Sequence, residues 1–148
     1  LNAAVRGAYG GRKEIRWTEA LAGKAAWSRV GSPLPVETLD AIIREVHRLG
    51  GLIIAAHVDR PSLSVIANLG MVPPDAEFDA LEISASLRKD EAVARFPFID
   101  RFPLVTASDA HFPRDIGGSP TLFLLEKMDI DEIRMAFQGR GEREYLIQ

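Results

Sequence analysis

The sequence contains no cysteine, and this absence excludes several classes of chemistry at once. Disulfides, zinc fingers, iron–sulfur ligation and thiol nucleophiles all require that residue. Any metal site must therefore use histidine and carboxylate ligands. Long apolar runs are missing too, because the longest fully apolar stretch, Leu52 to Ala56, is far short of the roughly 20 residues that span a bilayer. No secretory signal is visible, and we expect a cytoplasmic protein with no membrane partner.

The chain also has no excess of basic residues. Its 148 residues include 18 Lys and Arg against 21 Asp and Glu, for a formal net charge of −3. Non-specific attraction to nucleic-acid phosphates usually requires a basic surface, so we expect no strong nucleic-acid binding. A small anionic substrate stays compatible with this charge, because a metal ion or a local arginine can reverse the field. The remaining composition is that of one soluble globular domain.

Helical and strand patterns alternate after the first 32 residues, which form a poorly defined leading segment. The clearest helix begins near Val36 with an apolar stripe and ends at Gly50-Gly51. Strands are expected at 52–56, 79–84, 103–107, 121–125 and 144–147, and helices at 62–69, 89–95 and 129–138, the last with an Asp129/Glu132 capping box. This βα rhythm predicts an α/β fold with a parallel sheet of four or five strands, whose carboxyl ends gather ligands.

Two of the chain's three histidines follow expected strands. His57 comes directly after the apolar run 52–56, where it is either a ligand at the mouth of the sheet or a core histidine bonded to a backbone carbonyl. His111 belongs to Asp109-x-His111, which follows the strand at 103–107. His47 lies inside the first helix among charged residues, and we interpret it as an ordinary surface or boundary side chain.

Asp109 and His111 are spaced so that both can converge on one cation from an irregular turn, and both suit Zn, Mn or Fe. The alternative is that Asp109 or Ser108 caps a turn while His111 packs on Phe112. A serine hydrolase built on Ser108 and His111 is a further alternative, although no Gly-x-Ser-x-Gly elbow surrounds Ser108. Glu82 lies on the strand between the two candidate ligand loops. It is a candidate ligand, base or partner for Arg88, and we favour a supporting role.

Three segments occur in an order that resembles a known family. They are Gly50 to His57, Asp79 to Ser84 and Ala107 to His111. Together they resemble the C-terminal half of the polymerase-and-histidinol-phosphatase (PHP) domain, over about Val36 to Thr121. The resemblance implies the C-terminal portion of a distorted (β/α) barrel with mostly parallel strands. It also implies a metal-dependent phosphoesterase that hydrolyses phosphate esters with a metal-bound hydroxide.

The same resemblance assigns metal-ligand roles to His57, Asp109 and His111, with Zn, Mn or Fe as the divalent ions. Arg60 and Arg114 each follow a ligand loop by three residues, and we expect them to bind substrate phosphate unless they form ordinary surface ion pairs. The expected partner is a small phosphorylated substrate. No protein nucleophile is needed.

The family's N-terminal His-x-His has no counterpart here, because no histidine precedes His47. Three ligands cannot fill a metal cluster. We therefore expect residues 1–148 to be a single α/β domain that is a fragment of a larger PHP-type barrel, completed by a missing N-terminal half or a partner chain. The isolated chain should then be inactive. The alternative from another class is a non-catalytic remnant that serves as a binding or assembly module.

Overall fold

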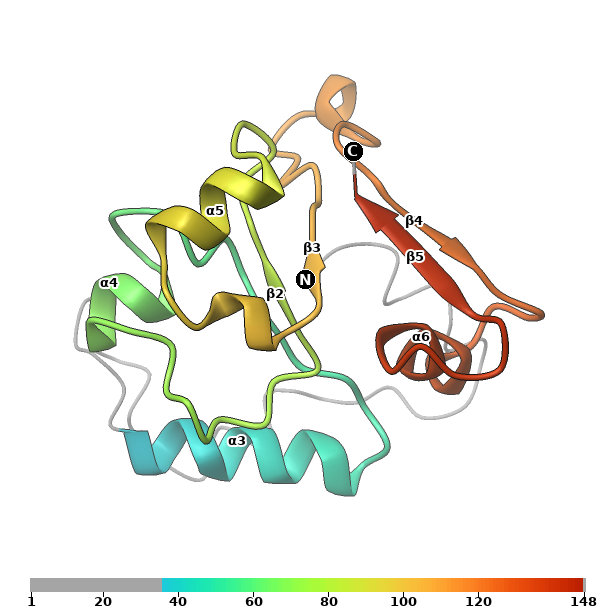
Figure 1. Cartoon of the computed structure of the whole chain (residues 1–148), viewed down its shortest axis with the longest axis horizontal. Coiled ribbons are helices and arrows are strands. Elements are labelled where there is room, and N and C mark those ends of the chain that lie inside the picture. Colours follow the sequence, from blue (N-terminus) through green and yellow to red (C-terminus); the bar gives the residue numbers. More distant parts are fainter. Residues whose placement is uncertain (1–35, 148) are drawn as a thin grey trace.

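The computed structural model describes residues 36–147, so the leading segment of the first 32 residues lies outside the described residues. The elements follow the expected alternation of helices and strands (Figure 1). They are α3 (Val36–Arg48), β1 (Ile54–Ala55), α4 (Val65–Leu69), β2 (Ala80–Glu82), α5 (Lys89–Arg95), the short 3₁₀ helix η2 (Ile99–Arg101), β3 (Leu104–Val105), the 3₁₀ helix η3 (Pro113–Asp115), β4 (Thr121–Leu124), α6 (Ile130–Phe137) and β5 (Glu144–Ile147). The predicted α/β fold is confirmed.

The central sheet is parallel, in the order β1-β2-β3. Ile54 lies opposite Ala80, and Leu81 lies opposite Leu104. Backbone bonds continue the pairing beyond the strands, since Ile83 N donates to Val105 O at 2.9 Å. A parallel connection needs a crossover, and α4 and α5 supply the two crossovers. Closure of this sheet into a barrel stays a prediction.

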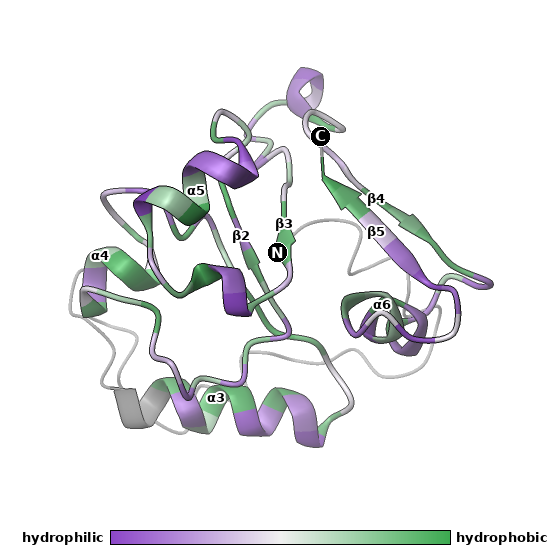
Figure 2. Cartoon of the chain, in the orientation of Figure 1, coloured by the Kyte–Doolittle hydropathy of each residue, from purple (hydrophilic) through white to green (hydrophobic). Residues whose placement is uncertain are grey.

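The core lies between this sheet and the helices that cover it. Ile43 projects from the apolar stripe of α3, and Figure 2 shows apolar and polar residues alternating along that helix. The helix ends as expected at Gly50, whose φ of 76° favours glycine. A Cβ on Gly51 would lie 2.9 Å from Val46 Cγ1, so the chain can turn there only without a side chain. The fully buried large side chains are Ile43, Val58, Leu81, Ile83, Ile99 and Leu104.

The expectation of four or five parallel strands is wrong for β4 and β5. These two strands form a separate antiparallel sheet with Phe123 opposite Tyr145. Their side chains alternate between half-buried and exposed, which is the pattern of a sheet covered on one face. Phe123 and Tyr145 pack with Phe137 of α6, their ring centroids 5.4 to 6.1 Å apart. The β4–β5 unit is thus held by its own helix.

Two polar contacts join this unit to the parallel sheet. Arg134 of α6 donates from Nη2 to the carbonyls of Gly50 and Gly51, each at 3.1 Å. Thr121 Oγ1 accepts from Thr106 N at 2.9 Å and donates to Thr106 O at 2.8 Å. The start of β4 is therefore pinned beside the end of β3. No helix within residues 36–147 is long and apolar enough to cross a membrane.

A buried ion pair closes the β4–β5 unit. Glu132 receives two hydrogen bonds from Arg143, at 2.9 and 3.0 Å, and also accepts from Glu126 N at 2.9 Å. The predicted capping box is therefore only half present. Asp129 caps Glu132 N as expected, but the Glu132 side chain turns to Arg143 instead of back to the cap. The Arg143 hydrogen bond, followed by that from Glu126 N, holds the pKa of Glu132 below its ordinary value.

We expect Glu132→Gln to lower the melting temperature by more than about 4 °C near pH 7. A carboxyl whose pKa is lowered by folding stabilises the fold above its unfolded pKa, and this contribution disappears as the pH falls through the folded pKa. The difference between wild type and Glu132→Gln should therefore shrink below about pH 4.5. Thermal denaturation at several pH values measures it.

Asp131→Asn is the matched control, because Asp131 is an exposed partner of Arg134 on the same helix. Exposed pairs contribute little, so this variant should melt close to the wild type. Equal melting temperatures for the two variants would contradict the importance of the buried pair.

Candidate functional site

The carboxyl ends of β1, β2 and β3 lie at one edge of the parallel sheet, because the three strands run in the same direction (Figure 1). His57 lies in the turn after β1, Glu82 is the last residue of β2, and Asp109 lies in the segment after β3. The sheet thus brings together residues some fifty positions apart in sequence. This placement is the one that the spacing of apolar runs and polar residues predicted.

The turn after β1 is fastened to the end of β2. Val58 N donates to Glu82 O at 2.8 Å, and Asp59 Oδ1 accepts from Ser84 N at 2.7 Å. His57 has a φ of 30°, which is uncommon outside glycine and clusters at functional sites in proteins. Its Nδ1 is buried and has no hydrogen-bond partner. Of the two alternatives for His57, the core histidine satisfied by a backbone carbonyl is thus not supported at Nδ1.

Asp109 lies among positively charged and imidazole groups. Its Oδ2 is 2.7 Å from Arg60 Nη2 and 3.8 Å from His111 Nε2. Burial by itself would raise the pKa of the Asp109 carboxyl. The hydrogen bond and charge of Arg60 outweigh burial, with further help from His111 and His57, and the pKa lies below its ordinary value. Asp109 also has a positive φ, of 44°.

Glu82 lies near the same group of residues. Burial raises the pKa of the Glu82 carboxyl, and the nearby charges of His57, Asp109 and Arg60 partly oppose one another in their effect on it. The expected alternative partner, Arg88, pairs instead with Asp90, Arg88 Nε lying 3.0 Å from Asp90 Oδ1. Glu82 therefore belongs to the candidate site rather than to a surface ion pair.

The segment after Asp109 is exposed. The His111 side chain is 78% exposed, so it is not packed against Phe112 in a core. Arg114 does not turn toward Asp109. Its guanidinium lies over the Phe112 ring, 5.0 Å from the centroid, and its Nε is 3.6 Å from Asp115 Oδ1. The two arginines singled out in the sequence thus have different surroundings, Arg60 in the site and Arg114 beside it.

His47 lies apart from this group. Its Nε2 is 2.9 Å from Asp79 Oδ2, which also accepts from Ile53 N at 2.7 Å. Asp79 precedes β2, so this contact is at the amino end of the sheet, opposite the candidate site. His47 is half-buried, as a boundary residue would be, but it has a specific structural partner that the helix pattern did not reveal.

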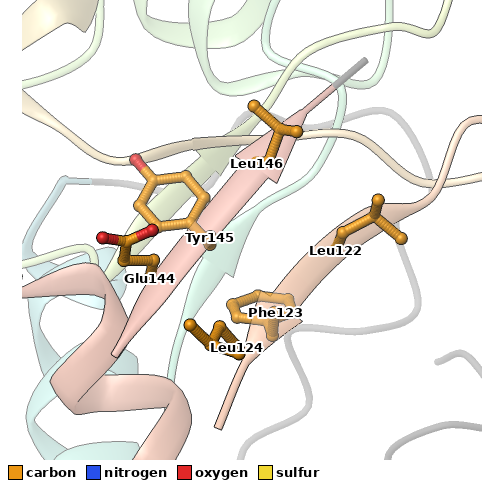
Figure 3. Close-up of a pocket in the computed structure, with 6 residues that line it drawn as sticks. All are labelled: Leu122, Phe123, Leu124, Glu144, Tyr145 and Leu146. Atoms are coloured by element: carbon orange, nitrogen blue, oxygen red, sulfur yellow. The ribbon is translucent and has the colours of Figure 1, made fainter. Parts of the chain in front are cut away.

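Two hollows in the surface of residues 36–147 lie away from these side chains. One, of about 320 Å³, is on the β4–β5 sheet and is lined by the six residues drawn in Figure 3. The other, of about 220 Å³, lies at the amino ends of β2 and β3 beside α6. Neither is lined by His57, Asp109 or His111. The candidate site is therefore a group of loops distinct from both hollows.

No family model matches the chain. In sequence it is similar to the uncharacterized protein YqxK of Bacillus subtilis, 29% identical over 108 residues that cover 70% of this chain and 28% of YqxK. A shorter stretch of 42 residues is 52% identical to NADP isocitrate dehydrogenase of Staphylococcus aureus. That match covers 28% of this chain and 10% of the dehydrogenase, so it assigns no activity.

Two crystal structures resemble the fold. The lesion-specific endonuclease PfuEndoQ from Pyrococcus furiosus is 27% identical, with a TM-score of 0.58. Endonuclease Q in complex with a 27-mer duplex substrate, with an abasic lesion at the active site, is 26% identical, with a TM-score of 0.55. Each likeness covers 72% of this chain and 28% of the endonuclease chain. This chain therefore spans little more than a quarter of the length of either endonuclease chain.

The donor atoms fit a divalent cation in kind but do not enclose one. Imidazole and carboxylate suit Zn, Mn and Fe, and the unpartnered Nδ1 of His57 can offer a lone pair to a cation when that nitrogen is unprotonated. Within residues 36–147, however, no three His, Asp or Glu side chains are gathered closely enough to hold an ion. One Asp109 oxygen is already bonded to Arg60. The described residues therefore form a partial donor set.

Sequence reasoning did not single out Asp59, which fixes the turn carrying His57 to Ser84. The only available signal was its position two residues after the histidine, and that spacing alone does not distinguish a structural carboxylate from an exposed one. Nor did the sequence indicate that Arg60 would pair with Asp109, because the two residues are brought together only by the strand order.

We expect Arg60→Met to raise the pKa of Asp109, because the hydrogen bond and the charge that lower it are removed while burial remains. Titration of the carboxyl ¹³C resonance by NMR in metal-free buffer measures this pKa. Arg114→Met is the control and should leave the pKa of Asp109 unchanged, since Arg114 contacts Phe112 and Asp115. An Asp109 pKa that stays low in Arg60→Met would contradict the assignment.

Proposed function

We propose that this chain contributes part of a divalent-metal phosphoesterase site, in which His57, Asp109 and His111 are metal ligands. The observation that supports this most directly is that His57, Asp109 and His111 all follow strands at the same edge of the parallel sheet, with His57 Nδ1 buried and unpartnered. A structural role leaves that nitrogen unexplained, because buried polar atoms are normally hydrogen-bonded. The likeness to endonuclease Q over 72% of the chain adds the reaction class.

A divalent ion in such a site supplies a Lewis acid that polarises a phosphoryl oxygen and lowers the pKa of a bound water. The chain's own residues supply orientation and charge. Asp59 holds the His57 turn against β2, and Arg60 positions the Asp109 carboxylate. Because the Arg60 side chain is 43% exposed beside that carboxylate, its guanidinium can also contact a substrate phosphate that approaches from solvent. Arg114, beside Phe112, is a second phosphate contact in this proposal.

The substrate class that the comparisons favour is a nucleic-acid phosphodiester rather than a small phosphorylated molecule. Endonuclease Q binds a 27-mer duplex with an abasic lesion at its active site. From the net negative charge of the chain we expected no strong nucleic-acid binding, because non-specific attraction to nucleic acid requires a basic surface. A local contact at the loops does not require a basic surface, so the proposal and the net charge are compatible.

The remaining ligands and walls of the site come, in this proposal, from further sequence. The chain spans 28% of the endonuclease Q chains and 28% of YqxK. The expected His-x-His ligands have no counterpart in this sequence, and residues 36–147 hold only a partial donor set. We therefore keep the assignment to a PHP-type barrel, with 1–148 as one domain of it, as a proposal, together with the cytoplasmic location.

Metal titration tests the proposal directly. We expect the chain to bind Mn²⁺ or Zn²⁺ measurably by isothermal titration calorimetry. His57→Ala and Asp109→Ala should each lower the metal affinity at least about 10-fold. Replacing a residue that only hydrogen-bonds to a metal ligand typically lowers affinity by about 10- to 100-fold, and removing the ligand itself should lower it at least as much. His57→Ala should keep its fold, because the Nδ1 atom that it removes has no hydrogen-bond partner, and circular dichroism can verify this.

His47→Gln is the matched control. His47 is the remaining histidine of the described residues, and it lies at the other end of the sheet with Asp79 as its partner. Its replacement should leave metal affinity unchanged. If His57→Ala and Asp109→Ala both bind metal as the wild type does, or if the wild type binds none, the metal site is refuted and the non-catalytic assembly module becomes the better interpretation.

A further inference from the structure

One exposed aromatic ring lies directly beside the candidate site. Phe112 follows His111 in sequence and is 58% exposed, although a phenylalanine contributes more to stability when it is buried. The Arg114 guanidinium lies over its ring, 5.0 Å from the centroid, and the Arg114 side chain is 81% exposed. Ile116, two residues further on, is also strongly exposed. The segment thus presents a ring, a planar cation and an aliphatic side chain to solvent.

The loop holds this pair in place from within. Asp115 N donates to Phe112 O at 2.9 Å, and Phe112 N donates to Asp115 Oδ2 at 3.2 Å, which closes the short helix η3. Gly118 N then donates to Asp115 O at 3.2 Å, returning the chain toward Ser108. Because the backbone on both sides of Arg114 is bonded, the loop exposes Phe112 without needing the ring for its own packing.

We propose that Phe112 and Arg114 form a stacking platform for a nucleobase next to the phosphodiester that is cleaved. This inference rests on the proposed function and adds the part of the substrate that the site contacts. Bases stack on aromatic rings and on guanidinium planes, and such stacking supplies sequence-tolerant binding. The platform is one residue from His111, so a base on it places the adjoining phosphate near the candidate ligands.

A nucleic acid fits this platform better than a protein partner does. The platform combines an aromatic ring with a cation. A nucleotide carries a flat base next to a negatively charged phosphate, so it can contact both. A chain with a net charge of −3 lacks the general attraction that draws nucleic acid to basic proteins, so recognition has to come from local contacts of this kind. Endonuclease Q, to which the fold is similar, binds a duplex substrate with an abasic lesion at its active site.

The same chain contains a matched control pair. Phe98 is 51% exposed, and Arg101 lies over its ring at 5.3 Å. This pair precedes β3, whereas Phe112 and Arg114 follow it, so the two pairs lie at opposite ends of that strand (Figure 1). Any general effect of removing an exposed phenylalanine that is stacked by arginine should therefore appear at both positions. A role in substrate binding should appear only at Phe112.

The test measures binding of a single-stranded DNA oligonucleotide containing 2-aminopurine to the 148-residue chain in the presence of EDTA. We expect Phe112→Ala to weaken binding about 5-fold or more and to abolish the stacking-dependent fluorescence change. Phe98→Ala should bind as the wild type does. Arg114→Lys, which keeps the charge but loses the planar surface, should fall between the two. The affinity should depend only weakly on salt, as expected for about one phosphate contact.

Because EDTA removes the metal, this result is independent of the metal titration. Loss of metal binding in the wild type would refute the phosphoesterase site while leaving the stacking result to stand. Equal oligonucleotide affinities for Phe112→Ala and Phe98→Ala, or no binding by the wild type, would overturn the platform. Circular dichroism of both variants verifies that each keeps its fold.

Discussion

The parallel hydrogen bonding of β1, β2 and β3 is the constraint on which the candidate site depends. Val58 N to Glu82 O and Ile83 N to Val105 O continue the ladders past the ends of the strands. These bonds make the turn after β1 and the segment after β3 neighbours. An antiparallel arrangement would separate His57 from Asp109 by the length of the sheet. The strands themselves are short, so these outer bonds and the packing of Leu81 and Leu104 determine the alignment.

The electrostatic balance of the site rests on one arginine among several carboxylates. Arg60 bonds Asp109 directly and reduces the effect of burial on Glu82. In the metal-free protein, Arg60 stabilises the ionised carboxylate of Asp109. A bound divalent ion would stabilise the same carboxylate. Metal binding and the Arg60 contact are therefore coupled in our proposal, and substrate phosphate gives the guanidinium another partner.

The β4–β5 sheet illustrates how a correct local prediction can lead to a wrong global one. The expected strands at 121–125 and 144–147 both exist, but they pair with each other. In the structure Leu122 and Leu124 lie on the exposed face of β4 and Phe123 on the other, a difference that the unbroken apolar run of the sequence does not show. The burial of Glu132 against Arg143, which closes this unit, joins a residue of α6 to the residue just before β5, and no local pattern encodes that contact.

Local physics determined much of this protein from sequence alone. The end of α3 at Gly50, the helix at Lys89–Arg95, the Asp109 segment after a buried strand and the general α/β class all follow from backbone preferences and apolar periodicity. Tertiary structure alone decided which side chains meet. Strand order and the path of the loops bring Arg60 to Asp109 and His47 to Asp79. They also leave the Phe112 side chain exposed to solvent. These are properties of contacts between distant residues, which the spacing of neighbours along a chain does not specify.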